Sequence, residues 1–190
     1  HQHFYGEARK PTDAKRIGMM WHTAEFKGIP DGLQAVEKAR RAVPDLTLVL
    51  FASHHSTGVP DYAEFHLAPP VQKIREIYTS CDVFLSPSWS EGSQAPPMEA
   101  MACGCAVVAT NVGGIPDYAI NGETVIAVPP KRPDLLSEAL IDLLMDDGKR
   151  QLVALAGHRH IQQFTWDRAT DQLENTFDII LQDLPSTMVP

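Results

Sequence analysis

Short, continuously apolar runs recur along the chain between longer stretches of mixed polarity. Runs of this kind, bounded by turn residues, are typical of strands that are buried on both faces. We expect strands at Ile17–Trp21, Leu46–Ala52, Glu64–Ala68, Asp82–Ser86, Ala106–Ala109 and Val125–Val128. The third of these is the least apolar, and it follows a loop rich in glycine, proline and serine.

Between the strands, apolar residues repeat with helical spacing. In Ile29–Val43 they stand at Leu33, Val36 and Ala39, and the helix is expected to stop before Pro44. Further helices are expected at Val71–Thr79, Met98–Cys103, Pro133–Met145, Lys149–Phe164 and Trp166–Leu181. Strands that alternate with helices predict an α/β fold, here a Rossmann-like parallel sheet with helices on both faces and additional C-terminal helices.

The last expected helix carries an apolar stripe. Its members are Ala169, Leu173, Phe177, Ile180 and Leu181. Residues at this spacing share one face of a helix, and we interpret the stripe as ordinary core packing.

The opening segment has a different character, because His1–Thr12 is polar and shows no period. We expect residues 1–15 to be a linker or a cloning remnant. A chain of 190 residues suits one domain, and we expect residues 16–190 to form it.

Composition narrows the function classes. The net charge of -8 argues against a nucleic-acid partner, because a nucleic-acid-binding face is usually basic. The longest apolar run is about half of what a membrane span needs, and no signal segment is visible. We therefore expect no transmembrane segment and a cytoplasmic location. Cys103 and Cys105 stand in an apolar run and are expected to be small buried side chains beside the sheet.

In an open parallel sheet, ligands bind beyond the carboxyl ends of the strands. The richest loop there follows Ser86 and leads to a helix that is expected to start near Pro96. The first amides of that helix lack intrahelical partners and suit a phosphate. Two carboxylates flank this place, Glu91 and Glu99. Glu99 alone could equally be a first-turn residue that stabilises the helix.

Several motifs then coincide. Glu91 and Glu99 are separated by seven residues, and Ala100–Gly104 reads Ala-Met-Ala-Cys-Gly. A Val-Gly-Gly turn ends at Gly114, and Lys27 precedes a glycine. Together these motifs resemble the retaining glycosyltransferases of family GT4, which have the GT-B fold of two Rossmann-like halves. The resemblance is to the C-terminal, nucleotide-sugar-binding half, and it covers most of the chain, from Ile17 to Phe177.

The resemblance implies roles for these residues. Glu91 and Lys27 would be catalytic, with Glu91 on hydroxyls of the donor sugar and Lys27 on the diphosphate. Glu99 would bind the ribose hydroxyls. The remaining substrate-binding residues would be His22, Gly92, Ser93, Gln94, Ala95 and Pro96. No metal and no other cofactor is expected, because Lys27, His22 and the helix N-terminus would balance the diphosphate.

The sequence departs from the family pattern at two places. Trp21 and His22 stand where the family usually has Gly-Arg, and imidazole lacks the fork of a guanidinium. Gln94 stands where the family has a second loop glycine, which puts a close backbone approach in doubt.

The resemblance implies an enzyme, the donor-binding half of a hexosyl-type glycosyltransferase that moves a sugar from a nucleoside diphosphate to an acceptor with retention. We expect its partners to be a nucleoside diphosphate sugar and an N-terminal acceptor domain outside this chain, without which it would be inactive. Peripheral membrane contact would come only through that other half. The main alternative is a non-catalytic nucleotide-sugar-binding regulatory module. A nucleotide-sugar epimerase of the same fold and a flavodoxin-like signalling domain fit less well.

Overall fold

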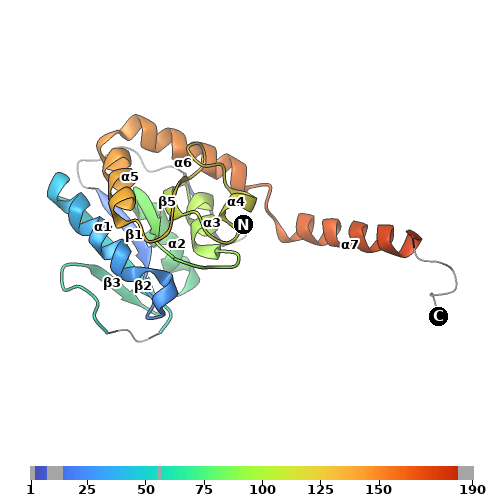
Figure 1. The fold of residues 1–190 in the computed structure, drawn as a ribbon, viewed down its shortest axis with the longest axis horizontal. Coiled ribbons are helices and arrows are strands. Elements are labelled where there is room, and N and C mark those ends of the chain that lie inside the picture. The colour runs from blue at the N-terminus through green and yellow to red at the C-terminus, as the bar shows by residue number, and fades with distance from the viewer. Residues whose placement is uncertain (1–2, 8–14, 55–56, 184–190) are drawn as a thin grey trace.

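The computed structural model describes residues 3–7, 15–54 and 57–183, and its centre is a parallel sheet of six strands (Figure 1). The strands run β3-β2-β1-β4-β5-β6 across the sheet. Their bounds are Arg16–Met20 (β1), Thr47–Ala52 (β2), Glu64–Leu67 (β3), Val83–Ser86 (β4), Ala106–Thr110 (β5) and Ile126–Val128 (β6). The chain turns to one side of β1 with β2 and to the other with β4, so β1 and β4 flank the switch point of the topology.

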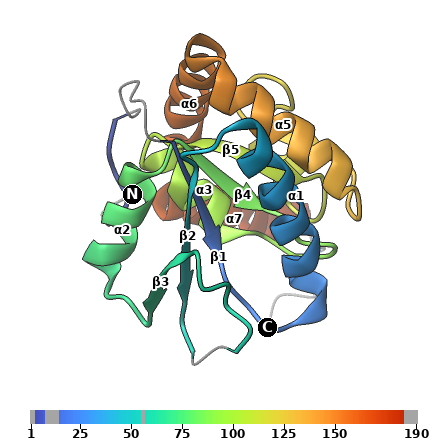
Figure 2. The same cartoon turned by 90° about the vertical axis from the view of Figure 1, so that its left-hand side faces the viewer.

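Helices cover both faces of the sheet. Figure 2 shows α1 (Ile29–Ala42) and α5 (Pro133–Met145) together on one side of the strands, and α2 (Val71–Ser80) on the other, where α3 (Ala95–Ala102) also packs. The helix α6 (Asp147–Ile161) contacts α3, α5 and β5. The expected α/β architecture is confirmed.

Neighbouring side chains of a strand point to opposite faces of the sheet, so each strand contributes to two hydrophobic cores. Met19 and Leu50 belong to the core under α1 and α5, whereas Val49 and Phe51 belong to the core under α2 and α3. Both sides of a strand are therefore apolar, which is why the strands read as continuous apolar runs. Cys81, Cys103 and Cys105 are free and buried, as expected for the last two.

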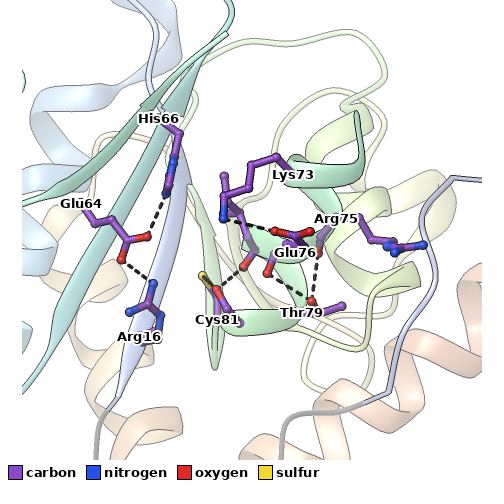
Figure 3. A network of polar contacts seen from close by, with 10 residues as sticks. Arg16, Glu64, His66, Lys73, Arg75, Glu76, Thr79 and Cys81 are labelled. Carbon is purple, nitrogen blue, oxygen red and sulfur yellow. Dashed lines mark hydrogen bonds and ion pairs between the residues drawn. The ribbon is translucent and has the colours of Figure 1, made fainter. Parts of the chain in front are cut away.

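Charged side chains contact one another at the edge strand β3. Glu64 accepts a hydrogen bond from Arg16 Nη2 at 2.6 Å and lies 2.8 Å from His66 Nε2 (Figure 3). The pKa of Glu64 is lowered, and the hydrogen bond from Arg16 is the largest cause. The ion pair therefore links the edge strand β3 to β1 across β2.

The helix α7 (Trp166–Asp183) contradicts the expectation of core packing. It extends away from the sheet and its helix layers (Figure 1), and its apolar stripe faces solvent, with Leu173 54% and Phe177 54% exposed. Thr165 caps its start by accepting a hydrogen bond from the Arg168 amide. The spacing correctly predicts a helix with an apolar face, but spacing alone does not say what that face contacts.

Two single-turn elements were outside the sequence expectations: the 3-10 turn η1 (Glu25–Lys27) and the short helix α4 (Ile115–Tyr118). Both are too short for a helical period to show.

Part of the predicted linker lies outside the described residues. Its described part packs against α2, where the Phe4 ring lies edge-on to Tyr78 with 5.8 Å between the ring centroids. No helix of the described chain is long and apolar enough to cross a membrane.

Candidate functional site

A cavity of about 250 Å³ opens at the carboxyl ends of β1 and β4, beside the switch point. Met20, His22 and Lys27 line it from the chain that follows β1. The end of β4 and the loop after it supply the remaining walls: Phe84, Leu85, Ser86, Pro87, Ser88, Glu91, Ser93, Gln94, Ala95 and Pro96. The volume lies below the roughly 300–1,000 Å³ of pockets that enclose a whole small molecule, so it suits part of a larger ligand.

Lys27 is held at this cavity by the turn that carries it. Gly28 follows η1 in the left-handed region, with φ 62°. A Cβ atom on Gly28 would lie 2.1 Å from the Pro87 carbonyl oxygen, so only glycine lets the two loops approach. The packing of the two loops thus requires glycine after Lys27. This close approach places Lys27 against the loop that follows β4.

Lys27 and Glu91 form the central ion pair of the cavity. The Lys27 ammonium lies 2.7 Å from Oε1 of Glu91, and the Ser88 hydroxyl donates to the same oxygen at 2.8 Å. Both side chains keep some contact with solvent, 25% for Lys27 and 12% for Glu91. A cation and an acceptor that remain accessible can exchange this pairing for an anionic, hydroxyl-bearing ligand.

The N-terminus of α3 forms the other polar wall. Proline has no N–H, and α3 begins Ala95-Pro96-Pro97, so of its first three residues only Ala95 can donate a backbone hydrogen bond. Within the described chain, Gln94 at the N-cap makes no side-chain capping hydrogen bond. The buried Gln94 side chain instead accepts a hydrogen bond from the Ser86 hydroxyl at 2.7 Å. The φ of Gln94, -95°, is ordinary, so the backbone there needs no glycine. The Ala95 amide, the helix dipole and Lys27 together favour an anion.

His22 presents one defined nitrogen. Its Nδ1 accepts a hydrogen bond from the Ala24 amide at 2.9 Å. An accepting Nδ1 carries no proton, so a neutral imidazole here bears its proton on Nε2. His22 can therefore donate a hydrogen bond to an anion at the cavity without becoming charged.

A second glycine turn fixes the loop around Glu91. The Gly114 amide donates to the Gly92 carbonyl at 2.8 Å. Gly113 has φ 56°, and a Cβ atom there would lie 2.3 Å from the same carbonyl oxygen. Glycine is therefore needed at position 113 for the two loops to meet, and the contact holds the loop that carries Glu91.

Glu99 lies outside the lining of the cavity. It stands one helical turn after Ala95 on the same face of α3. Its Oε2 accepts a hydrogen bond from the Tyr78 hydroxyl at 2.9 Å. Burial raises the pKa of Glu99, and the Tyr78 hydrogen bond opposes that rise. The carboxylate is thus bonded from within the protein at one of its oxygens.

The structure brings most of the expected site residues to one cavity: His22, Lys27, Glu91, Ser93, Gln94, Ala95 and Pro96. Gly92 and Glu99 do not line the cavity: the Gly92 carbonyl accepts the hydrogen bond from the Gly114 amide, and Glu99 lies one helical turn after Ala95. Sequence reasoning did not assign roles to Tyr78, Ser86 or Ser88. The serine cluster of the loop was a visible signal for the latter two, whereas nothing in the sequence pairs Tyr78 with Glu99.

Among the residues that the structure describes, no group of three or more His, Cys, Asp or Glu could hold a metal ion.

Comparisons with known proteins point in one direction. The family model for "Glycosyl transferases group 1" matches residues 15–146. The D-inositol 3-phosphate glycosyltransferase of Corynebacterium diphtheriae is 30% identical over an alignment of 183 positions, which covers 88% of this chain and 43% of that protein. The chain therefore spans less than half the length of this curated relative.

Solved structures share the fold. The C-terminal domain of a glycosyl transferase group 1 family protein, LpcC of Francisella tularensis, superposes with a TM-score of 0.73 at 22% identity, covering 85% of this chain and 95% of that one. The Anabaena protein HepE in complex with UDP-glucose has a TM-score of 0.73 at 18% identity, covering 87% of this chain and 49% of HepE.

Proposed function

The chain belongs to the group 1 glycosyltransferases as a C-terminal, Rossmann-like domain of the GT-B type, and on that premise we propose that it binds the donor, a nucleoside diphosphate sugar, for a transfer that retains the anomeric configuration. One observation carries the proposal: Lys27, Glu91 and the uncapped N-terminus of α3 line a single cavity.

Each of these groups has a task in the proposed transfer. As the bond between sugar and diphosphate breaks, negative charge grows on the departing diphosphate. Lys27 and the Ala95 amide at the start of α3 stabilise that charge, and Nε2 of His22 adds a neutral donor. Glu91 accepts hydrogen bonds from hydroxyls of the sugar. Donor binding exchanges the internal Lys27–Glu91 pairing for contacts with the ligand.

We also propose that no metal ion takes part in donor binding. The positive groups just named supply the charge balance that a divalent ion would otherwise give. Nucleotide affinity is then expected to be unchanged by EDTA and by added magnesium, measured by calorimetry. A clear rise in affinity on adding magnesium would contradict this part of the proposal.

A second domain completes the proposed enzyme and binds the acceptor. The match covers only 43% of its relative from Corynebacterium diphtheriae. The exposed stripe of α7 offers an apolar surface for that domain. The chain alone is expected to bind donor but transfer no sugar, and product formation by the isolated chain would refute this.

A reducing, cytoplasmic setting suits its free cysteines and belongs to the same proposal.

Calorimetric titration with UDP, GDP, ADP and dTDP tests the donor proposal. We expect one of the four to bind at micromolar Kd, which corresponds to about -8 kcal/mol. Lys27→Met should weaken it by at least about tenfold, because a charge-assisted contact is lost. Lys149→Met is the matched control, since Lys149 pairs with Asp142 on the exposed surface. Binding of none of the four nucleotides, or equal weakening by both variants, would contradict the proposal.

The alternative, a non-catalytic nucleotide-sugar-binding module, rests on Trp21 and His22 in place of Gly-Arg. Of these two residues, Trp21 is buried in the core cluster beneath α1 and α5, whereas His22 lines the cavity. Transfer by the longer protein that contains this chain would favour the enzyme. Donor binding without transfer there would favour the module.

A further inference from the structure

Trp89 joins the two loops that carry the ion pair of the cavity. It lies two residues before Glu91, and its backbone amide donates a hydrogen bond to the Phe26 carbonyl at 2.6 Å. Its indole Nε1 donates to Oδ2 of Asp31, in the first turn of α1, at 2.7 Å. Phe26 and Asp31 stand on either side of Lys27 in the sequence. Trp89 is therefore bonded to both sides of the turn that carries Lys27.

The ring of Trp89 is held as well as its two N–H groups. The Lys131 ammonium lies over the ring, 4.6 Å from its centroid. A Cβ atom on Gly28 would lie 3.1 Å from Cδ1 of the ring, so the turn packs closely against it. Lys131 has φ 60°, a left-handed conformation that costs free energy for a lysine. Strain of this kind persists only where surrounding contacts hold it, and the cation–π contact with Trp89 is one of them.

The anchor at Trp89 is one of two that flank Glu91. On the other side of Glu91, the Gly92 carbonyl accepts a hydrogen bond from the Gly114 amide at 2.8 Å. That second bond joins backbone atoms alone, whereas the link from Trp89 to α1 depends on the indole N–H, a donor that phenylalanine lacks. A substitution at Trp89 therefore loosens one side of the loop and leaves the other side held.

The place of Lys27 depends on this anchor once a ligand enters. Donor binding, as proposed above, opens the pairing between Lys27 and Glu91. Neither hydrogen bond of Trp89 uses the side chain of Lys27 or of Glu91, so both bonds persist when the pair opens. A charged group that binds and stabilises a reacting ligand must stay in place, since a displacement of about 1 Å already weakens its effect.

We propose that Trp89 is a positioning residue of the donor site: its indole, bonded to Asp31, keeps the turn of Lys27 against the loop of Glu91, so that the ammonium meets the diphosphate. This inference rests on the proposed function and goes beyond it, because Trp89 lies outside the lining of the cavity. Trp89 touches no ligand and acts through Lys27.

A double-mutant cycle tests this coupling. Trp89→Phe keeps a ring but removes the indole N–H, and it is titrated with UDP, GDP, ADP and dTDP in the wild-type and in the Lys27→Met background. For the nucleotide that binds, Trp89→Phe should weaken affinity about fivefold in the wild-type background, the size of one lost hydrogen bond. In the Lys27→Met background it should cause no further loss, because the group that it positions is gone. Trp166→Phe is the matched control, since Trp166 is 88% exposed.

Two substitutions at Asp31 separate the hydrogen bond from the charge. Asp31→Asn keeps an oxygen that accepts from the indole, whereas Asp31→Leu removes it. Both take the negative charge from the first turn of α1. Asp31→Leu should weaken nucleotide affinity about fivefold, as Trp89→Phe does, and Asp31→Asn less than about twofold. Thermal melting followed by circular dichroism shows that each variant is folded.

A further readout needs no ligand. Exchange of the Trp89 amide hydrogen, followed by NMR, reports the opening of its bond to Phe26. Exchange should be about tenfold faster in Asp31→Leu than in the wild type, and little changed in Asp31→Asn. Equal rates in the three proteins would show that the indole contact does not hold the loop, which would overturn the inference.

The other outcomes separate this inference from the donor proposal. Equal losses for Trp89→Phe in both backgrounds indicate a merely structural tryptophan and overturn the inference while donor binding stands. A loss in Asp31→Asn as large as that in Asp31→Leu assigns the effect to the charge at the helix start and overturns it too. If the wild-type chain binds none of the four nucleotides, the donor proposal fails and the positioning role fails with it. That failure is recognised in the wild-type titration, before any variant is compared.

Discussion

The two ends of β4 each carry a cluster of charges, and the clusters differ in how far they are buried. At the amino end, Arg150 lies 3.5 Å from Asp82 and also pairs with Asp147, which Lys15 holds at 2.6 Å. The Arg150 and Asp82 side chains are 2% and 0% exposed. At the carboxyl end, the Lys27–Glu91 pair borders the cavity and stays 25% and 12% exposed.

Burial decides what each cluster can do. Arg150 and Asp82 are enclosed by protein, with Asp147 at the rim of their cluster, and Asp82 also accepts a hydrogen bond from the Arg16 amide that starts β1. They tie α6 to the sheet and cannot exchange partners without a large cost. The carboxyl-end pair is held by loops and can be opened by a ligand. An ion pair therefore indicates function here by its accessibility and its neighbouring cavity, not by its short distance.

The largest effect is expected from breaking the amino-end cluster. Arg150→Met should lower the free energy of unfolding by about 3–5 kcal/mol, because it removes the positive charge that faces the buried Asp82 carboxylate. Urea denaturation followed by circular dichroism measures this. Arg159→Met on the exposed side of the same helix is the control and should change stability little. A loss below about 1 kcal/mol for Arg150→Met would erase the contrast between the two ends.

An intermediate effect is expected where backbone packing supports the carboxyl end. Gly113→Ala should cost about 1–3 kcal/mol in unfolding free energy, because its Cβ would clash with the Gly92 carbonyl. Gly122→Ala separates strain from clash: Gly122 has φ 81°, but a Cβ there meets no described atom within 4 Å. The same denaturation assay should show the larger loss for Gly113→Ala, and equal losses would mean that the loop contact is unimportant.

A smaller effect on stability is expected at the functional pair. Lys27→Met should change the unfolding free energy by less than about 1 kcal/mol, because the partly exposed pair contributes little net stability. The comparison is sharpened if this variant unfolds like the wild type in urea yet loses nucleotide affinity. A stability loss as large as that of Arg150→Met would show that Lys27 is structural.

The smallest effect is a pH dependence at the rim of the amino-end cluster. Lys15, and after it Arg150, lower the pKa of Asp147. A carboxyl whose pKa is lower in the folded state contributes full stability above its unfolded pKa of about 4, and loses it as pH falls through the folded pKa. Asp147→Asn should thus reduce the stability lost between about pH 5 and pH 3 in urea titrations. Asp171→Asn, on exposed α7, should leave that slope as in the wild type.

The fold was predictable from the sequence because its strands are short continuous apolar runs and its long helices repeat apolar residues with a helical period. The boundaries agree to within one or two residues for most elements, including α1 and α5. The surroundings of α7 were not predictable, since an apolar stripe looks the same whether it packs on its own domain or stays exposed. The cavity residues were identified through loop position and family resemblance. The Tyr78–Glu99 contact joins two helices through side-chain geometry, which no local pattern encodes.

The buried thiols have a practical consequence. Burial raises the pKa of Cys103 to about 12 and that of Cys105 well above its ordinary value. At neutral pH neither forms appreciable thiolate, so maleimide reagents should pass over them, as should mild oxidants. A single cysteine placed on α7, at Leu173 for instance, would then be the preferred site for a fluorophore or spin label. Such a probe would report directly when that helix is covered by a second domain.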